Sequence, residues 1–157
     1  MKKEQTIDYN IKAAWHAIMR MYNQYGADFD ITASTGFVLL NIDSEHGTPA
    51  TKIAPALGME SRSLTRMLKS LEDKGWIYRQ KDSTDGRSIL IFLTDLGKEK
   101  RELSRRAVRE FNIQVGERIS AKEMESFFKV LSVISKTIES NIIFDRLAEE
   151  LAEQTIN

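Results

Sequence analysis

Apolar side chains recur every three or four positions along several segments of the chain, which is the spacing that places them on one face of a helix. Residues 7–25 follow this spacing and predict a first helix, which Gly26 is expected to end. The same spacing, with capping residues, predicts five more helices: Thr32 to about His46, Thr48-Pro49 to Gly58, Ser61 to Lys74, one from Thr94, and one from Ser120, which has Glu123 at the spacing of a capping box.

A different pattern separates the helix that ends at Gly75 from the helix that starts at Thr94. Two short, mostly apolar segments, Trp76–Gln80 and Ser88–Leu93, predict strands joined by the charged loop 81–87. Because an isolated hairpin is not stable in water, this one must rest on the helices around it. The sequence therefore predicts a mainly α fold with a small β hairpin attached to a helical body.

Composition narrows the class of protein. At 157 residues the chain is one domain-sized unit, or one unit that needs a copy of itself. It has no cysteine, which excludes disulfides, thiolate catalysis and zinc ribbons. No apolar run approaches the length of a membrane span, and the N-terminus MKKEQTIDYN lacks the apolar run of a secretory signal. We expect a cytoplasmic protein without a membrane partner.

The sequence offers little support for catalysis. The only two histidines, His16 and His46, are 30 residues apart, and no zinc-ligand spacing is present. Gly-rich phosphate loops and the G-x-S-x-G and H-E-x-x-H motifs are also missing. We therefore expect no enzymatic activity, no metal and no cofactor.

Charge is unevenly distributed although the net charge is zero, with 23 basic and 23 acidic residues. Residues 60–87 contain seven basic and five acidic side chains, and residues 98–109 contain six basic and two acidic ones. Residues 139–157 contain one basic and five acidic side chains. A positive middle and a negative C-terminal end are compatible with binding a polyanion, whereas the zero net charge keeps a protein-interaction module as an alternative.

The predicted helix from Ser61 to Lys74 has two contrasting faces. One sector carries the apolar residues Leu64, Met67, Leu68 and Leu71. The opposite sector carries three cations flanked by hydroxyls: Arg62, Arg66 and Lys69, with Thr65 and Ser70 beside them. Arginine can bind guanine through two hydrogen bonds, and lysine and hydroxyls reach phosphates, so this face suits a DNA major groove. A solvated helix face is the alternative interpretation.

The neighbouring segments favour the DNA interpretation. A short helix, a turn containing Gly58 and the cationic helix together form a helix-turn-helix pattern. The hairpin that follows then becomes a wing, and Arg87 near its tip can enter a narrow minor groove. Asp85 can hold the Arg87 guanidinium in position. The alternative is an ordinary hairpin turn with a local ion pair.

These residues carry a family resemblance. The segment IAPALGMESRSLTRMLKSLEDKGWIYRQKDSTDGRSILIFLTDLGKE, residues 53–99, resembles the winged helix-turn-helix of MarR-type transcriptional regulators. The pieces SLTRMLKSLEDKGWI, DGR and LTDLGKE all match, and the flanking helices fit as well. The resemblance implies a homodimer that binds a palindromic operator on double-stranded DNA and releases it when a small, often phenolic, ligand binds.

The resemblance also implies a division of the chain and a set of contact residues. Residues 1–30 and 95–157 would form the dimerisation region, and residues 31–94 the winged DNA-binding domain. The DNA-binding residues would be Ser61, Arg62, Ser63, Thr65, Arg66, Lys69, Asp85 and Arg87. Two positions depart from the family pattern. Glu60 caps poorly, so Ser61 is expected to cap and shift the helix start by one residue, and Pro55 should kink the short helix.

Apolar residues beyond the winged domain predict a two-fold homodimer. They are Phe111, Val115, Phe127, Phe128, Ile134, Ile138, Ile142 and Ile143, with Ile7 and Ile11 contributed by the first helix. A dimer would place two recognition helices about 34 Å apart, matching successive major grooves. Candidates for binding a small aromatic effector lie on the first helix and its exit: Trp15, His16, Met19 and Tyr22, with the aromatic residues Tyr25 and Phe29 beside them. Ordinary packing is the alternative for all of them. The sequence thus predicts a dimeric DNA-binding transcriptional regulator, a repressor released by a small molecule, with a winged-helix interaction module that does not bind DNA as the alternative.

Overall fold

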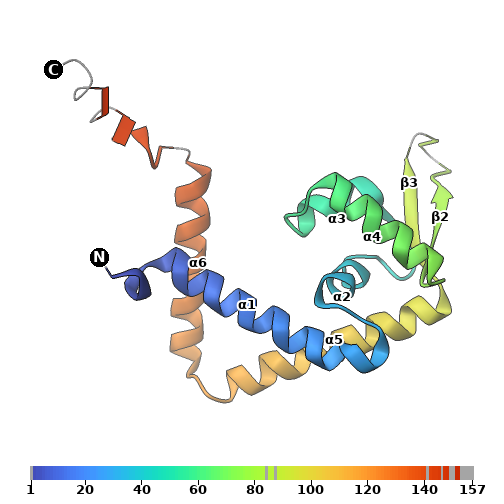
Figure 1. Cartoon of the computed structure of the whole chain (residues 1–157), viewed down its shortest axis with the longest axis horizontal. Helices are drawn as coiled ribbons and strands as arrows, with labels where there is room; N and C mark the ends of the chain where they lie inside the picture. Colours follow the sequence, from blue (N-terminus) through green and yellow to red (C-terminus); the bar gives the residue numbers. More distant parts are fainter. Residues whose placement is uncertain are drawn as a thin grey trace. The chain divides into compact units, whose positions relative to one another are not determined.

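The computed structural model describes residues 2–152 except 84, 87, 141, 146, 149 and 150, so Arg87 lies outside the described residues. The helices are α1 (Ile7–Gly26), α2 (Ala33–Leu40), α3 (Ala50–Ala56), α4 (Ser61–Asp73), α5 (Asp95–Gly116) and α6 (Ala121–Glu139), with single 3-10 turns η1 (Lys3–Gln5) and η2 (Ala27–Phe29). The strands are β1 (Thr48–Pro49), β2 (Ile77–Lys81) and β3 (Ile89–Leu93). Figure 1 shows the hairpin of β2 and β3, which follows α4 and leads into α5 along the chain. The prediction of a mainly α fold with a small β wing is confirmed.

The chain divides into two compact units, residues 1–110 and residues 111–157. The first unit holds one hydrophobic core. Helices α2, α3 and α4 and the strands β2 and β3 contribute Val38 and Leu39, then Ile53, then Leu64, Leu68 and Leu71, then Ile77, Ile91 and Leu93, and the connections add Ile42 after α2 and Trp76 before β2. Most of these side chains are fully buried. The core fixes the orientation of α4 because its three leucines point inward.

The second unit contains the end of α5 and helix α6. Ser120 caps α6 through a capping box with Glu123, as the sequence predicts: the Glu123 amide donates to Ser120 Oγ, and the Ser120 amide donates to the Glu123 carboxylate. No residue of α6 is buried. Its exposed apolar side chains include Phe127, Phe128, Val130, Val133 and Ile138. Helix α6 therefore presents an apolar surface that the described part of this chain leaves uncovered.

The start of α2 agrees with the sequence, but its end does not. Thr32 caps α2 in a reciprocal box with Thr35. The helix ends at Leu40, well before His46, because a turn follows in which the Asp43 carboxylate accepts hydrogen bonds from the Glu45 and His46 amides. The prediction of a helix extending to about His46 is therefore wrong.

The dipeptide Thr48-Pro49 has a different role from the one its sequence suggests. It forms the short strand β1 and pairs antiparallel with β3, giving a three-stranded sheet in the order β1-β3-β2. Thr48 Oγ1 accepts a hydrogen bond from the Asp43 amide, and Pro49 is the N-cap residue of α3. The predicted threonine cap with proline at the first helical position is wrong. Proline suits this place because an edge strand can do without its N–H.

The first helix ends at Gly26, as the sequence predicts. Gly26 does so with an ordinary negative φ, not in the left-handed conformation typical of a helix-ending glycine, and the chain continues into η2. The left-handed residue that ends this segment is Asp30, with φ 60°. A Cβ atom on Gly26 would collide with the carbonyl of Ile31, so the glycine permits a close approach of the connection to α1. By contrast, Gly58 and Gly75 adopt positive φ after α3 and α4, as helix-ending glycines do.

The hairpin forms as predicted, with each strand starting one residue later. Tyr78 faces Phe92 across the β2–β3 pair, and the two rings stack with centroids 5.3 Å apart. At the far end, Thr94 Oγ1 accepts from the Gly97 amide and donates to the Gly75 carbonyl oxygen at 2.6 Å. Thr94 therefore starts α5 and ties it to the end of α4. None of the helices in the described residues is long and apolar enough to cross a membrane.

Candidate nucleic-acid interface and adjoining pocket

Helix α4 presents its cations to solvent because its opposite face is buried. Leu64, Leu68 and Leu71 lie in the core, at the spacing of one helix face. By helix geometry, Arg62, Arg66 and Lys69 must then point away from the core, and all three are exposed. The stripe of three cations predicted from the sequence is therefore present on the surface. We call Arg62, Arg66 and Lys69 the cationic stripe.

The cationic stripe has no internal partner in the described part of the chain. The ion pairs found there engage other residues, such as Arg79 with Glu72 at 3.0 Å and Lys74 with Asp30 at 2.7 Å. The three stripe cations are absent from these pairs, so they can bind an external anion without first breaking a contact. Free cations at this spacing suit a row of phosphates or the acceptor edges of guanine.

Basic residues on α5 are paired instead. Arg105 and Arg106 both contact the Glu102 carboxylate, with nitrogen–oxygen distances of 2.7 Å and 3.3 Å. These hydrogen bonds and charges hold the pKa of Glu102 below its ordinary value. Lys98 lies 3.5 Å from Asp95. The positive segment 98–109 therefore differs from α4, because acids on its own helix already contact several of its cations.

Hydroxyl residues border the stripe at the start of α4. Ser61, Ser63 and Thr65 are exposed. The helix begins at Ser61 with Glu60 in the N-cap position, and the Glu60 side chain makes no capping hydrogen bond. The predicted one-residue shift of the helix start is therefore wrong. Thr65 Oγ1 donates to the Ser61 carbonyl oxygen at 2.8 Å, so the hydroxyl proton of Thr65 is engaged within the helix.

Helices α3 and α4 form the helix-turn-helix pair. The turn between them contains Gly58 with φ 60°, and the Met59 amide donates to the Ala54 carbonyl oxygen at 3.0 Å. Pro55 lies in the last turn of α3. Ile53 of α3 and Leu64 of α4 share the same core cluster. The sequence-predicted contacts on α4 are thus brought together on one exposed helix that packs against a second helix.

The wing loop is closed by backbone hydrogen bonds near its base. The Asp82 amide donates to the Ser88 carbonyl oxygen at 3.0 Å, and the Ser88 amide donates to the Asp85 carbonyl oxygen at 2.8 Å. Asp85 is exposed. Because Arg87 lies outside the described residues, its predicted pairing with Asp85 and its minor-groove contact stay predictions.

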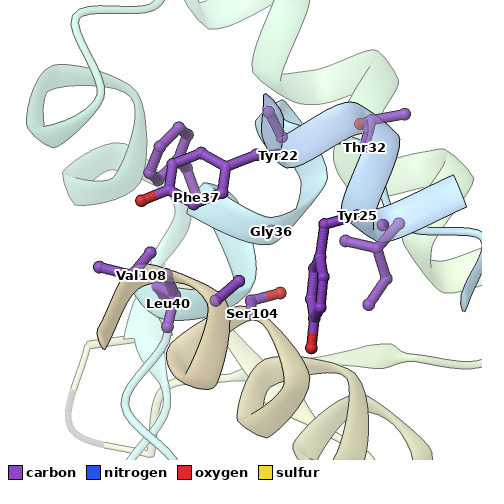
Figure 2. A pocket seen from close by; sticks show the side chains of 12 residues that line it. Tyr22, Tyr25, Thr32, Gly36, Phe37, Leu40, Ser104 and Val108 are labelled. Atoms are coloured by element: carbon purple, nitrogen blue, oxygen red, sulfur yellow. The ribbon is translucent and has the colours of Figure 1, made fainter. Parts of the chain in front are cut away.

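A pocket lies between α1, α2 and α5 (Figure 2). It contains about 340 Å³ of empty space, part of it open to solvent. The lining residues are Tyr22, Tyr25, Gly26, Ile31, Thr32, Ala33, Gly36, Phe37, Leu40, Ser104, Ala107 and Val108. In Figure 2 the aromatic side chains of Tyr22, Tyr25 and Phe37 surround the space. It is therefore an aromatic, apolar pocket formed within the first unit.

Comparison with known proteins identifies the family. A sequence profile of the MarR family matches residues 31–89. The HTH-type transcriptional regulator SarZ of Staphylococcus saprophyticus is 32% identical over 129 residues, which cover 80% of this chain and 85% of SarZ. The chain belongs to the MarR family. MarR-family proteins are transcriptional regulators, so the prediction that this protein is not an enzyme is confirmed.

Two solved structures show how closely the fold is shared. The S. aureus MepR–DNA complex matches with a TM-score of 0.77 and 26% identity, covering 84% of this chain and 98% of that chain. CouR from Rhodococcus jostii RHA1 bound to p-coumaroyl-CoA has a TM-score of 0.76 and 18% identity, covering 85% and 94%. At that identity the likeness to CouR shows the fold alone. One structure with this fold thus holds DNA, and another holds p-coumaroyl-CoA.

The four residues proposed from the sequence to bind an effector have different places in this MarR-type chain. Tyr22 lines the pocket. Trp15 stacks on Phe37, with ring centroids 5.8 Å apart, and so lies behind a lining residue. Met19 is half-buried, and His16 is exposed on α1. Tyr25, which the sequence places in the same aromatic group, lies one helical turn from Tyr22 and lines the same space. Phe29 packs against Tyr25, with ring centroids 5.8 Å apart.

Electrostatically the pocket is neutral. No Lys, Arg, His, Asp or Glu is among the residues that line it in the described part of the chain. Burial raises the pKa of the Tyr22 phenol, which keeps its proton in place at neutral pH. Ser104 Oγ donates its proton to the Lys100 carbonyl oxygen at 3.0 Å. The lining therefore offers aromatic surface and hydroxyls but no charge to neutralise an ionised ligand.

Proposed function

We propose that this protein is a homodimeric cytoplasmic repressor of transcription, which binds a palindromic operator and releases it when a small aromatic effector binds. In this proposal residues 31–94 bind DNA, and residues 1–30 and 95–157 form the dimer. Helix α4 reads the major groove through Ser61, Arg62, Ser63, Thr65, Arg66 and Lys69, and the wing contributes Asp85 and Arg87.

One observation carries the DNA-binding part, namely the exposed, unpaired cationic stripe on the second helix of a helix-turn-helix. Arginines on such a helix can bind guanine through two hydrogen bonds, and Lys69 can bind a phosphate. The relative MepR, solved as a DNA complex, supports the assignment. The family to which the chain belongs supports a role in transcription.

Exposed apolar surface supports the proposed dimer. Ile7 and Ile11 on α1 are exposed, as are Phe127, Phe128 and Ile138 on α6. Exposed apolar surface of this extent is typical of a protein–protein interface. A two-fold pair presents two copies of α4 to one face of DNA, which explains why the operator would be palindromic.

The pocket supports the effector part. Its aromatic lining fits a small planar ligand, and CouR, which shares the fold, has been solved with p-coumaroyl-CoA. Because the pocket is formed by α1, α2 and α5, an occupant contacts both the proposed dimerisation region and the winged domain. Binding there can favour an arrangement that no longer fits the operator.

A salt titration tests the proposal directly. Fluorescence anisotropy with duplexes recovered from a genomic pool should give tight binding at about 50 mM salt and affinity lower by orders of magnitude at about 200 mM. Sedimentation of the free protein should give a dimer. If no duplex binds, including its own promoter region, or affinity does not depend on salt, the DNA-binding role is rejected in favour of a protein-interaction module.

A further inference from the structure

Two lysines converge on one buried tryptophan in the first unit. Trp76 is 3% exposed and lies between the end of α4 and the start of β2. The Lys74 ammonium lies 4.9 Å from the centre of its ring, and the Lys100 ammonium lies 5.2 Å from it. Lys74 is the C-cap residue of α4, and Lys100 belongs to α5. Each ammonium thus gains a cation–π contact that helps to fix its position.

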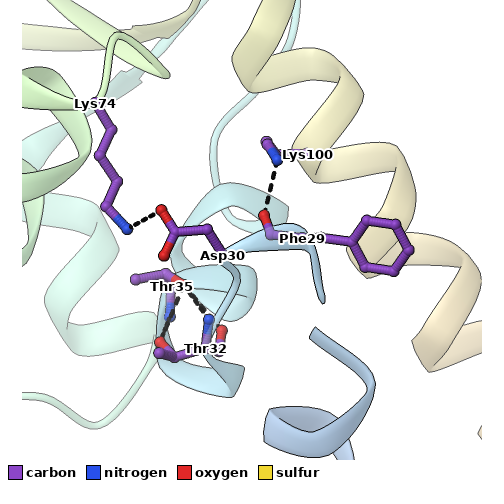
Figure 3. Close-up of polar contacts among 6 residues, drawn as sticks. All are labelled: Phe29, Asp30, Thr32, Thr35, Lys74 and Lys100. Carbon is purple, nitrogen blue, oxygen red and sulfur yellow. Dashed lines mark hydrogen bonds and ion pairs between the residues drawn. The ribbon is translucent and has the colours of Figure 1, made fainter. Parts of the chain in front are cut away.

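Both lysines also hold the connection between α1 and α2 (Figure 3). Lys74 Nζ lies 2.7 Å from Asp30 Oδ2, and Lys100 Nζ donates to the Phe29 carbonyl oxygen at 2.7 Å. These residues are 44 and 71 positions apart in sequence. We call Asp30, Lys74 and Lys100 the lysine clamp. It joins the end of α1 to the end of the cationic helix α4.

The connection that the clamp holds is itself rigid. Asp30 adopts left-handed backbone, which few residues other than glycine, asparagine and aspartate tolerate. The Ile31 amide donates to the Gly26 carbonyl oxygen at 2.9 Å, and the Ala33 amide donates to Asn23 Oδ1 at 2.8 Å. Because these hydrogen bonds tie the connection to its neighbouring helices, the position of Asp30 determines the position of the end of α1. The clamp therefore fixes the direction of α1 relative to α4.

The direction of α1 relative to α4 affects where the two copies of α4 lie in a dimer. Under the proposed function, α1 belongs to the dimerisation region and α4 reads DNA, so the angle between them sets the spacing of the two copies of α4. We propose that Asp30, Lys74 and Lys100 are positioning residues that set the half-site spacing this protein accepts. None of the three needs to touch DNA. The inference rests on the proposed function and adds the residues that determine its geometry.

The Asp30–Lys74 pair of the clamp sets a geometry and contributes little to fold stability. The Asp30 side chain is 74% exposed and that of Lys74 is 35% exposed, so solvent weakens their attraction. The loss of one such contact should barely change folding. A dimer contains two clamps, however, and a spacing error at either one disturbs both half-sites. We expect discrimination between spacings to fall by about tenfold when the clamp is broken.

The test compares two duplexes. The first is the operator recovered with the parent protein, and the second carries one additional base pair between the half-sites, which moves them apart by about 3.4 Å and rotates them by about 35°. The measured quantity is the ratio of the two affinities. The main variant is Asp30→Asn, because asparagine tolerates left-handed backbone but lacks the charge. Lys100→Met removes the second arm.

Matched controls separate geometry from charge. Asp28→Asn makes the same charge change two residues away, at an exposed position. Lys74→Arg keeps a cation against Asp30. We expect both controls to keep the parent ratio, whereas Asp30→Asn and Lys100→Met lower it about tenfold and leave the melting temperature within a few degrees of the parent. Removing an acid should by itself strengthen binding to DNA in general, so a lower ratio cannot arise from charge alone.

The outcomes distinguish the inference from the function on which it rests. If the parent binds no duplex or is monomeric, the proposed function is wrong, and the inference is wrong as well because it rests on that function. If the parent binds an operator but tolerates the additional base pair, or if Asp30→Asn and Lys100→Met keep the parent ratio, the inference alone is overturned. A variant that loses stability while keeping the ratio also overturns it, because that is the behaviour of a merely structural contact.

Discussion

The carbonyl oxygen of Trp76 occupies the space in which a Cβ atom on Gly97 would lie. Helix α5 therefore packs against the backbone between α4 and β2 at a point where only glycine fits. We expect Gly97→Ala to destabilise the protein by about 1–3 kcal/mol, the usual effect of overpacking, as measured by urea denaturation. Gly116→Ala is the control, since that position in the same helix has no neighbour within 4 Å of the added atom. It should be neutral or slightly stabilising; equal losses in both variants would contradict the close-packing argument.

Arg66 and Arg79 are both exposed arginines with different surroundings. Arg79 is paired with Glu72, whereas Arg66 belongs to the cationic stripe. If Arg66 contacts guanine, Arg66→Ala should weaken operator binding by about 1–3 kcal/mol and relax the base preference at one position. Arg79→Ala removes the same charge and should have a clearly smaller effect. Anisotropy titration of both variants against the same operator and a single-base-pair variant measures the difference.

Helix α4 was predictable from sequence because two independent signals agree. Its apolar spacing places Leu64, Leu68 and Leu71 on one face, and Gly75 ends it with positive φ. The cationic stripe follows from the same spacing. The candidate DNA-binding residues on this helix were therefore identifiable without coordinates, since one regular helix determines which side chains share its exposed face.

Features that depend on contacts distant in sequence were not predictable. Strand β1 has two residues and exists because it pairs with β3, about 40 positions later. Its Thr-Pro sequence, taken alone, is typical of the start of a helix. The close approach at Gly26 requires Ile31 to fold back onto α1. The pocket needs three helices, so Ser104 and Val108 gave no local signal. In each case contacts between residues distant in sequence determine a structure that the local sequence pattern does not predict.

Thr65 offers a test of how the exposed face of α4 recognises bases. Its hydroxyl proton is engaged by the Ser61 carbonyl oxygen, which makes its methyl group the candidate for a contact with the methyl group of thymine. Thr65→Val should retain affinity, whereas Thr65→Ser should lose part of it. Replacing the contacted thymine by deoxyuridine should weaken the parent but not Thr65→Ser. Equal effects of deoxyuridine on both proteins, measured by anisotropy, would exclude the methyl contact.

The hydrogen bonds in the turn after α2 predict that the stability of the protein depends on pH in the acidic range. Hydrogen bonds from the His46 and Glu45 amides hold the pKa of Asp43 below its ordinary value of 3.8. The pKa of Asp43 is therefore lower in the folded state than in the unfolded state. At a pH above the unfolded pKa, ionised Asp43 stabilises the folded state. This contribution to stability disappears as the pH falls through the folded pKa. Asp43→Asn should therefore melt below the parent at pH 7, and the difference between the two should shrink as the pH falls below 3.8 and through the folded pKa. A constant difference across this range would contradict the assignment.

The neutral lining of the pocket predicts which ligands release DNA. An ionised carboxylate would leave water without gaining a charged partner there, which disfavours its binding. We expect an uncharged aromatic such as 1-naphthol to displace the operator at lower concentration than 1-naphthoate, which has a similar ring system but is ionised at pH 7. Val108→Arg adds a cation at a lining position and should shift the preference towards the carboxylate. Displacement of the operator in an anisotropy assay measures both ligands. A parent that responds better to naphthoate, or a variant whose preference is unchanged, would show that the pocket does not select ligands by charge.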